Sequence, residues 1–516
     1  MIEMTLREIA DIVGGTLHDV PDPEAKVTGA VEFDSRAIGS GDLFLALPGE
    51  RVDGHTFAEK AIAQGAVAVL AARPVGVAAI VVEPRLGNTR AMALAHDTDG
   101  SGAAVLHALA KLARAAVDRL TAAGGLTVVG VTGSSGKTST KDLLAAVLAP
   151  LGTVVAPPGS FNNEIGHPWT ALRADADTRF LVLELSARGP GHIRALTEVA
   201  PPAVGVVLNV GTAHLGEFGS QEVIAQTKGE LVEALPASGL AVINLDDHLV
   251  AKMASRTRAR VVTVGVNANA DLRASNVRMD EQARARFTMH HNGSSIEIQL
   301  AVHGEHQVGN ALSAAAVALD CGADLETVAE ALEGATAVSA RRMDVRTRAD
   351  GVTVVNDSYN ANPDSVRAAL KALVTMSRAG GTDGTGREID RRRSWAVLGE
   401  MGELGEESVL EHDRIGRLVV RLDVDRLIVV GAGRPVRALF QGTVQEGSWG
   451  EEAVHVPDIA AAIELLDEEL EPGDVVLVKA SKSVGLWAVA EHLIGTADEH
   501  SINADEHVGA EQEAAR

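Results

Sequence analysis

Short apolar runs alternate with segments of helical periodicity along most of the chain. The apolar runs have the length and the Val, Ile, Leu and Ala content of buried strands, and the segments between them have the spacing of amphipathic helices. Strands that alternate with helices are typical of mostly parallel sheets in α/β proteins. The predicted strands cover residues 66–70, 79–82, 126–132, 180–183, 204–208, 240–243, 352–355, 395–398, 426–430 and 474–478, and the predicted helices include residues 106–120 and 138–148.

Two breaks divide this pattern into three predicted domains. Gly124-Gly125 ends the first, and a second boundary falls near residues 338–342. The predicted domains are residues 1–123, 124–338 and 339–495. The acidic residues 496–516 are poor in large apolar side chains, so we expect a disordered tail. Residues 87–100 and 377–393 resemble insertions, and the glycine-rich residues 377–386 predict a surface loop.

Length and composition support this division. At 516 residues the chain is too long for one hydrophobic core, and the usual size of a domain predicts about three domains. Because 46% of the residues are hydrophobic but only 3% are aromatic, the cores must consist mainly of Val, Leu, Ile and Ala.

Charge and hydropathy exclude several classes of protein. The formal net charge of −24 argues against nucleic-acid binding, which needs a basic face. The one cysteine, Cys321, cannot form an internal disulfide. The first residues lack the apolar core of a signal peptide, and no apolar run reaches the length of a membrane span. We therefore expect a cytoplasmic protein in which any anionic substrate is attracted by a local cluster of cations.

The strongest local motif is Gly133-Ser134-Ser135-Gly136-Lys137-Thr138, which stands between a predicted strand and a predicted helix. Glycines let backbone N–H groups approach phosphates, the helix N-terminus adds a positive end, and Lys137 can reach the terminal phosphates. The Thr138 hydroxyl is placed to bind Mg²⁺. Val131 stands where the usual motif has its first glycine, which indicates a shorter loop. The alternative, a glycine turn with a surface lysine, fits the strand, loop and helix order less well.

Polar residues that follow predicted strands are candidate metal ligands. Glu184 follows residues 180–183, and His214 comes shortly after residues 204–208. Ligands collect beyond the carboxyl ends of strands in such sheets, so both side chains can face the phosphate loop. A lone histidine after a strand is more often structural, and only the phosphate loop favours the metal interpretation.

Two further polar segments have no functional reading from the residues alone. Lys228-Gly229-Glu230 lies on a predicted helix that begins near Gln221 and reads as a solvated charged face. Residues 357–363 follow a predicted strand and read as a polar turn.

Taken together, these motifs resemble the Mur ligase family of ATP-dependent amide-forming enzymes, and the resemblance extends over nearly the whole chain. It implies an N-terminal UDP-sugar-binding α/β domain, a central P-loop mononucleotide-binding domain and a C-terminal Rossmann-like domain. By similarity, Glu184 and His214 bind Mg²⁺, and Lys228 matches a carbamylated lysine that supports a second Mg²⁺. Asn310 resembles an asparagine that contacts adenine. Arg342 and Asp357 match residues that meet the nucleotide when the domains close.

The resemblance therefore implies three overlapping groups of residues: catalytic residues, metal ligands and ATP-binding residues. The expected catalytic residues are Lys137, Lys228, His214, Arg342 and Asp357. The expected metal ligands are Thr138, Glu184, His214 and Lys228. The expected ATP-binding residues are Gly133, Ser134, Ser135, Gly136, Lys137, Thr138, Ser139, Asn310, Arg342 and Asp357.

Several segments narrow the expected substrates. Residues 160–166, 357–363 and 397–405 are similar to those of family members that add D-alanyl-D-alanine to UDP-N-acetylmuramoyl-tripeptide. Residues 34–36, 43–49 and 53–55 resemble segments that recognise the UDP-sugar. The expected substrate-binding residues are Asp34, Ser35, Arg36, Phe44, Asp53, Gly54, His55, Asn162, Asn163, Tyr359, Asn360 and Asn362.

The implied reaction transfers the γ-phosphate of ATP to the terminal carboxylate of the tripeptide, and the amine of D-alanyl-D-alanine then attacks the acyl phosphate. Two Mg²⁺ ions, no nucleic acid and a monomeric enzyme are expected. Four alternatives remain. They are a diaminopimelate- or lysine-adding Mur-type ligase, a folylpolyglutamate synthase, a non-catalytic nucleotide-binding homologue, and a P-loop ATPase that couples hydrolysis to motion.

Overall fold

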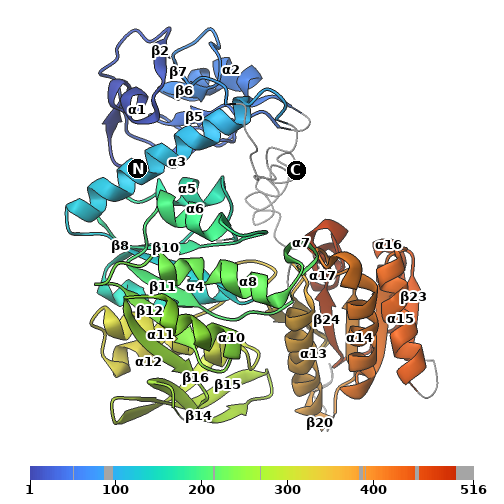
Figure 1. Ribbon diagram of the computed structural model, residues 1–516. Helices are drawn as coiled ribbons and strands as arrows, with labels where there is room; N and C mark the ends of the chain where they lie inside the picture. Colours follow the sequence, from blue (N-terminus) through green and yellow to red (C-terminus); the bar gives the residue numbers. More distant parts are fainter. Residues whose placement is uncertain are drawn as a thin grey trace.

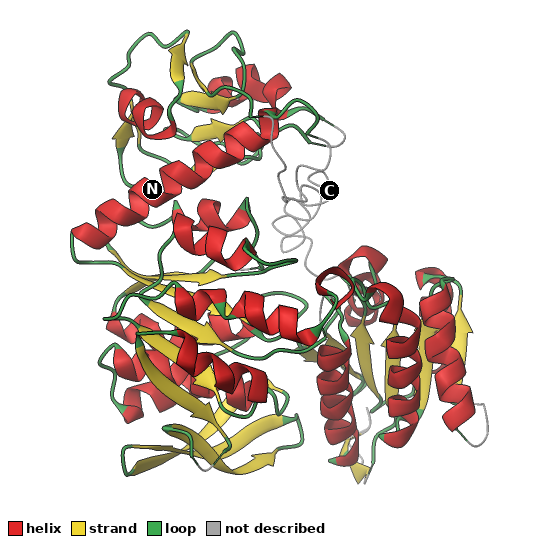
Figure 2. Ribbon diagram, in the orientation of Figure 1, coloured by secondary structure: helices red, strands yellow, loops and turns green. Residues whose placement is uncertain are grey.

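The computed structural model describes residues 1–49, 52–85, 97–157, 159–212, 215–267, 269–382, 388–389, 391–447 and 452–495. Three large β-sheets of five, nine and six strands follow one another along the chain, each covered by helices (Figures 1 and 2). The first two sheets lie one above the other in Figure 1, and the third lies beside the second. The predicted α/β fold is confirmed. The limits chosen for the three domains remain a prediction.

The N-terminal sheet has the order β2-β7-β6-β5-β4, and all its pairs are parallel except β2 with β7. The long helix α3 packs under this sheet and also against α5 of the central part, so the two share a hydrophobic core. The strands predicted at 66–70 and 79–82 and the helix at 106–120 are confirmed as β6, β7 and α3. The elements are β1 (Met4–Thr5), α1 (Leu6–Val13), β2 (Thr16–His18), β3 (Lys26–Val27), β4 (Val31–Glu32), β5 (Leu43–Leu45), α2 (Ala58–Gln64), β6 (Ala68–Ala71), β7 (Ala79–Val81) and α3 (Ser101–Ala122).

The central sheet has the order β16-β15-β14-β13-β12-β11-β8-β10-β9. Strands β8 to β14 run parallel, and four of them, β8, β10, β11 and β12, are the strands predicted from the sequence. Strands β9, β13 and β14 were missed, as were β15 and β16, which add an antiparallel edge next to β14. The elements are β8 (Thr127–Thr132), α4 (Lys137–Leu148), β9 (Thr153–Val155), α5 (Gly166–Ala171), β10 (Thr178–Glu184), α6 (His192–Val199), β11 (Val204–Val207), α7 (Leu215–Phe218), α8 (Gln221–Lys228), α9 (Glu230–Glu233), β12 (Leu240–Asn244), α10 (His248–Ala251), β13 (Arg260–Gly265), β14 (Leu272–Met279), β15 (Arg284–His291), β16 (Ser294–His303), α11 (Gln307–Asp320) and α12 (Leu325–Gly334).

The C-terminal sheet has the order β17-β18-β24-β21-β22-β23 and is parallel except for β17. The loop predicted at 377–386 is partly wrong, because α13 continues to Arg378 and β19 pairs with β20. The elements are β17 (Asp344–Thr347), β18 (Thr353–Asn356), α13 (Pro363–Arg378), β19 (Gly381–Thr382), β20 (Glu388–Ile389), β21 (Ser394–Leu398), α14 (Ser408–Arg421), β22 (Arg426–Val430), α15 (Arg434–Glu446), β23 (Ala453–Val456), α16 (Ile459–Glu469), β24 (Val475–Lys479) and α17 (Trp487–Ile494).

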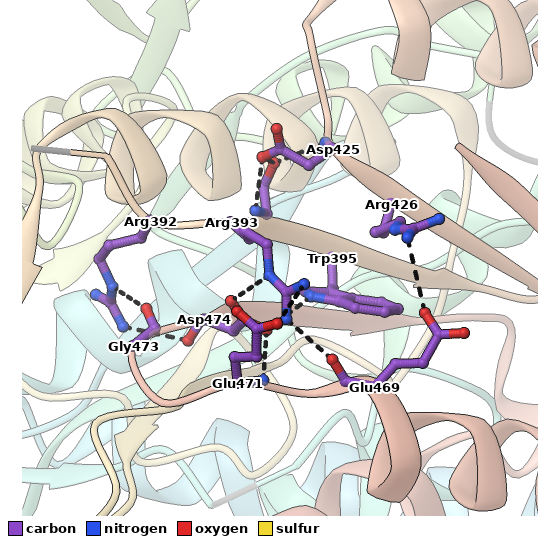
Figure 3. Close-up of polar contacts among 10 residues, drawn as sticks. Arg392, Arg393, Trp395, Asp425, Arg426, Glu469, Glu471, Gly473 and Asp474 are labelled. Carbon is purple, nitrogen blue, oxygen red and sulfur yellow. Dashed lines mark hydrogen bonds and ion pairs between the residues drawn. The ribbon is translucent and has the colours of Figure 1, made fainter. Parts of the chain in front are cut away.

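A polar network fixes the amino ends of the strands in this third sheet (Figure 3). The buried Trp395 indole donates a hydrogen bond to Asp474 Oδ2 at 2.9 Å, and Arg393 Nη2 donates to the same carboxylate at 2.7 Å. The guanidinium groups of Arg393 and Arg426 lie over the Trp395 ring, 5.6 and 5.9 Å from its centroid. The strands are thereby held at the end opposite to the loops after β21 and β24.

Several predictions fall on residues that are not described. They concern most of the segment 87–100, residues 383–386 of the predicted loop, His214 and the tail 496–516. Among the described residues, no helix is both long enough and apolar enough to cross a membrane.

Candidate active site

A cavity of about 1290 Å³ lies where the three sheets meet. It is larger than the roughly 300–1,000 Å³ that suit one small molecule, so it has room for several substrates. The phosphate loop lines it from the central part, the segments around Asp34 and Gly54 line it from the N-terminal part, and the loops after β18, β21 and β24 line it from the C-terminal part. The site expected from the sequence is thus assembled by all three parts of the chain.

The predicted phosphate loop lies between β8 and α4, as expected. Gly136 has a φ of +83°, and a Cβ there would come within 2.8 Å of Asn310 Oδ1, so only glycine suits this position. Asn209 fixes the loop from the end of β11, because its side chain accepts a hydrogen bond from Ser135 N at 2.9 Å and donates one to Ser135 O at 3.1 Å. The N-terminus of α4 therefore faces the cavity with its backbone held in place.

Lys137 begins α4 and lies inside the loop. Its Nζ donates a hydrogen bond to the Gly133 carbonyl oxygen at 2.8 Å. Burial lowers the pKa of Lys137, and the nearby Glu184 carboxylate opposes this shift. The ammonium group is thus held within the loop, beside the backbone groups that would receive phosphates.

Glu184 ends β10 next to this loop and is buried. Its Oε2 accepts hydrogen bonds from Ser160 Oγ at 3.0 Å and Thr138 Oγ1 at 3.3 Å. Its Oε1 is also buried, and no described residue gives it a hydrogen bond. A buried carboxylate oxygen without a donor is costly unless a cation or another donor reaches it, so this arrangement suits a metal ligand.

Lys228 ends α8, the helix predicted to begin near Gln221. Only 4% of the residue is exposed, so the solvated charged face that the residues alone suggested is wrong. Burial holds the pKa of Lys228 well below its ordinary value, and the charge of Lys137 lowers it further. His214, the other expected ligand, lies outside the described residues.

Arg342 reaches the phosphate loop from the linker that follows α12. Its Nη2 donates a hydrogen bond to Thr138 Oγ1 at 3.3 Å, and its guanidinium lies 4.1 Å from the centroid of the Tyr359 ring. Asn362 Nδ2 approaches the Ser134 carbonyl oxygen at 3.5 Å from the same side. The C-terminal part therefore contacts the loop directly.

Asp357 follows β18 and is buried in a pair with Lys479 at the end of β24. Lys479 Nζ donates a hydrogen bond to Asp357 Oδ2 at 2.6 Å, and Lys479 is 2% exposed. The reading of Asp357 as an ordinary polar turn is thus wrong. The expected site residues did not include Lys479, although residues 479–483 resemble a segment of the Mur ligase family, and the structure places Lys479 and Ser481 on the cavity wall.

The expected substrate-binding residues divide into two groups. Phe44 is 1% exposed within the N-terminal core, which corrects its expected position on the cavity wall. His55 Nδ1 lies 2.6 Å from Asp53 Oδ1, and His55 Nε2 accepts a hydrogen bond from Ala72 N, so both support the wall from behind. The residues that do line the cavity are Asp34, Ser35, Arg36, Gly54, Asn162, Asn163, Tyr359, Asn360 and Asn362.

Two of the expected ATP-binding residues remain to be placed, Ser139 and Asn310. Ser139 lines the main cavity. Asn310 lies in α11 behind Gly136 and lines an adjoining cavity of about 290 Å³ that also contacts the loop. A nucleotide base could enter this smaller cavity while its phosphates lie on the loop.

Comparison with known proteins agrees with this geometry. Residues 28–116 match the description "Mur ligase family, catalytic domain", residues 131–318 match "Mur ligase middle domain", and residues 341–482 match "Mur ligase, glutamate ligase domain". The UDP-N-acetylmuramoyl-tripeptide--D-alanyl-D-alanine ligase of Mycobacterium tuberculosis is 60% identical over 509 residues, which cover 96% of this chain and 98% of that protein. The chain belongs to the Mur ligase family.

Solved structures of Mur ligases have the same fold. The crystal structure of MurF from Acinetobacter baumannii superposes with a TM-score of 0.79 at 28% identity, covering 95% of this chain and 99% of that one. The MurF ligase of Thermotoga maritima in complex with ADP superposes with a TM-score of 0.71 at 29% identity, covering 90% and 97%. This Mur ligase therefore has the three-domain fold of those enzymes.

A buried histidine holds one wall of the cavity. His412 in α14 accepts a hydrogen bond from Met401 N at Nε2, at 2.9 Å, and donates from Nδ1 to the Ser408 carbonyl oxygen at 2.6 Å. Met401 precedes Gly402 and Glu403, which line the cavity. Burial lowers the pKa of His412 below its ordinary value of 6.5, which favours the neutral imidazole that accepts the Met401 N–H at Nε2.

We expect this histidine to make the folded protein less stable in mild acid. His412 takes up a proton at about pH 6.5 in the unfolded chain and only at lower pH in the folded chain. Its contribution to the free energy of unfolding is therefore complete above about pH 6.5 and declines as the pH falls below that value. The slope of this decline is at most about 1.4 kcal/mol per pH unit. Urea unfolding between about pH 5 and pH 8 should show a shallower pH dependence for His412→Gln. The exposed control His248→Gln should keep the slope of the unaltered protein, and equal slopes for all three proteins would refute the assignment.

Proposed function

We propose that this Mur ligase joins D-alanyl-D-alanine to UDP-N-acetylmuramoyl-tripeptide at the expense of ATP, in the synthesis of peptidoglycan. The observation that carries the proposal is the identity of 60% to a D-alanyl-D-alanine ligase of that name over nearly the whole of both chains. A cavity lined by the phosphate loop and by both outer parts of the chain supports it, because ATP, a carboxylate and an amine must meet in one place.

The residues around the loop have the charge that this reaction needs. ATP and a substrate carboxylate are both anions, and the chain as a whole is strongly acidic. Lys137, Arg342 and the N-terminus of α4 supply positive charge at the loop, where the γ-phosphate would be transferred to the carboxylate. The amine would then attack the acyl phosphate and release phosphate. Enclosure by three domains would keep water from hydrolysing this intermediate.

The donor set beside the loop fits Mg²⁺. We propose that Glu184 and the Thr138 hydroxyl, together with His214 and Lys228, hold two ions. The buried Oε1 of Glu184, without a hydrogen-bond donor among the described residues, supports this assignment. When bound, Mg²⁺ would neutralise the negative charge of the phosphates.

Carbamylation of Lys228 is part of the same proposal. An ammonium group would repel the ions, but burial and Lys137 favour the neutral amine, which is the form that reacts with CO₂. The resulting carbamate would offer oxygen ligands. Because a carbamate is in equilibrium with CO₂, ligation should fall in buffer depleted of CO₂ and recover when bicarbonate is added.

A matched pair of variants tests this prediction. We expect Lys228→Ala to lose most activity and to be insensitive to bicarbonate, whereas the exposed Lys371→Ala should behave like the unaltered enzyme. An unaltered enzyme whose rate is the same with and without CO₂ would contradict carbamylation and leave the rest of the mechanism in place.

We also propose that the enzyme acts as a cytoplasmic monomer. Its proposed substrates are a nucleotide and a nucleotide-linked peptide, which are found in that compartment. The described residues that line the cavity come from all three parts of the chain, which is the arrangement expected if one copy suffices for activity.

Phosphate release tests the proposed function directly. The protein is supplied with ATP, Mg²⁺ and UDP-N-acetylmuramoyl-tripeptide, with and without D-alanyl-D-alanine, and the product mass is measured. We expect release only when both co-substrates are present, with a pentapeptide product. Release that is indifferent to D-alanyl-D-alanine would contradict the proposed acceptor, and other amines such as diaminopimelate and lysine would then be compared.

A further inference from the structure

The linker between α12 and β17 has an unfavourable backbone conformation on both sides of Arg342. The residues on either side of it, Arg341 and Met343, have φ angles of +59° and +52°. Residues other than glycine rarely adopt this left-handed backbone conformation. Such strain persists only where the surroundings enforce it, and it is common where a side chain must be presented to a site.

The C-terminal part enforces the conformation from one side. Arg341 pairs with Glu491 at 2.8 Å, and its guanidinium lies 4.7 Å from the centroid of the Trp487 ring, both in α17. Met343 N donates a hydrogen bond to Asp357 Oδ1 at 3.2 Å. These contacts fix the linker to the third sheet.

Helix α4, which follows the phosphate loop, fixes the conformation of the linker from the other side, through Ser339. This serine is buried, and both its N and its Oγ donate hydrogen bonds to the Asp142 carboxylate at 3.1 Å. Lys141 Nζ donates a hydrogen bond to Ser339 Oγ at 3.3 Å. Lys141 and Asp142 lie in α4, one turn after Lys137 and Thr138, so the linker is attached to the same helix that Arg342 contacts.

Lys141 is a buried cation that the proposed mechanism does not use. It is 2% exposed and is not among the described residues that line the cavity. Besides Ser339 and the carboxylate of Asp142, its Nζ reaches the Pro157 and Gly159 carbonyl oxygens at 2.6 and 3.3 Å, in the segment that leads to Ser160. A lysine buried at such a cost, with partners in three segments, serves to hold those segments together.

We propose that Lys141 and Ser339 are positioning residues for ligation. They fasten the strained linker to α4, so that the Arg342 guanidinium stays at the phosphate loop while the domains move and the substrates exchange. Neither residue touches the substrates, and both act through Arg342. This inference rests on the proposed function, in which Arg342 stabilises the charge on the transferred phosphoryl group.

Ser339→Ala removes the hydroxyl contacts to Asp142 and Lys141 with little other disturbance, because the backbone N–H contact to Asp142 and the Lys141–Asp142 ion pair at 3.0 Å stay in place. We expect kcat for ligation to fall by about 100-fold, since a displacement of about 1 Å at a transition-state group has that effect, with the KM for ATP nearly unchanged. Ser339→Thr keeps the hydroxyl and should recover most of the rate. Lys141→Met should show the same change in kcat, and the exposed Lys371→Met should show none.

The deciding measurement is a double-mutant cycle with Arg342→Ala. If Ser339 acts through Arg342, the variant that combines Ser339→Ala with Arg342→Ala should be no slower than Arg342→Ala alone. With Arg342→Ala still slow, either of two results would overturn the proposal. In the first, the fold-losses in kcat of the two single variants multiply in the double variant. In the second, Ser339→Ala has the wild-type kcat at a temperature where thermal unfolding shows that it is folded. No ligation by the unaltered enzyme would instead overturn the proposed function and this inference with it.

Discussion

Replacing Lys137 by methionine should lower kcat for ligation by about 10²–10³-fold, the usual loss when one preorganised donor is removed from a developing charge. The Lys137 ammonium lies inside the phosphate loop, 2.8 Å from the Gly133 carbonyl oxygen. Methionine keeps most of the volume of the side chain and removes its charge, so the phosphates would lose the cation that faces them.

Steady-state kinetics with ATP, UDP-N-acetylmuramoyl-tripeptide and D-alanyl-D-alanine measure this effect. Lys371→Met serves as the control, because Lys371 is exposed on α13 and does not line the cavity. A Lys137→Met enzyme with normal kcat and only a raised KM for ATP would mean that the lysine contributes to ground-state binding alone.

The second large effect is expected on stability, at the Lys479–Asp357 pair. Both groups are buried, and Lys479 Nζ also donates a hydrogen bond to the Asn360 carbonyl oxygen at 2.9 Å. Burial lowers the pKa of Lys479, whereas the Asp357 carboxylate raises it. Removal of one partner leaves the other charge buried without compensation, so Lys479→Met should lower the free energy of unfolding by about 3–5 kcal/mol.

A double variant separates the stability contributed by the ion pair from that contributed by the rest of the core. We expect Asp357→Asn combined with Lys479→Met to lose less stability in urea than the sum of the two single losses, because no uncompensated charge remains. Additive losses would show that the two side chains act independently. The double variant should nevertheless ligate slowly, since Asp357 and Lys479 both line the cavity and their charges would be lost there.

The sequence predicted most of the parallel strands but not the antiparallel edge formed by β14 to β16. The parallel strands that the sequence predicted are buried on both faces and form continuous apolar runs, which are visible without knowledge of the neighbours, whereas the more exposed parallel strands β9 and β13 were missed. In β16 only alternate residues are buried. Whether such a half-polar segment forms a strand depends on the neighbouring strands in the sheet. Its alternation of apolar and polar residues is also a weaker sequence signal than a continuous apolar run.

Phe44 shows a similar limit at the level of one side chain. A strand sends successive side chains to opposite faces, and both faces of β5 are buried, with Leu43 and Leu45 in one core and Phe44 in another. The packing of the N-terminal sheet buries Phe44. The neighbouring turns, which depend less on that packing, do bring Asp34 and Gly54 to the cavity.

The sequence by itself determined the α/β pattern and the phosphate loop, because both depend on residues close together in the chain. Gly136 and Lys137 follow a strand and open a helix, and that local order suffices to predict phosphate binding. Only the tertiary structure decided that Lys228 is buried, that Lys479 meets Asp357 across 122 residues, and that Lys141 meets Ser339 across 198 residues. These contacts arise from the way the three sheets and their connecting segments pack, and no short-range pattern of residues specifies that packing.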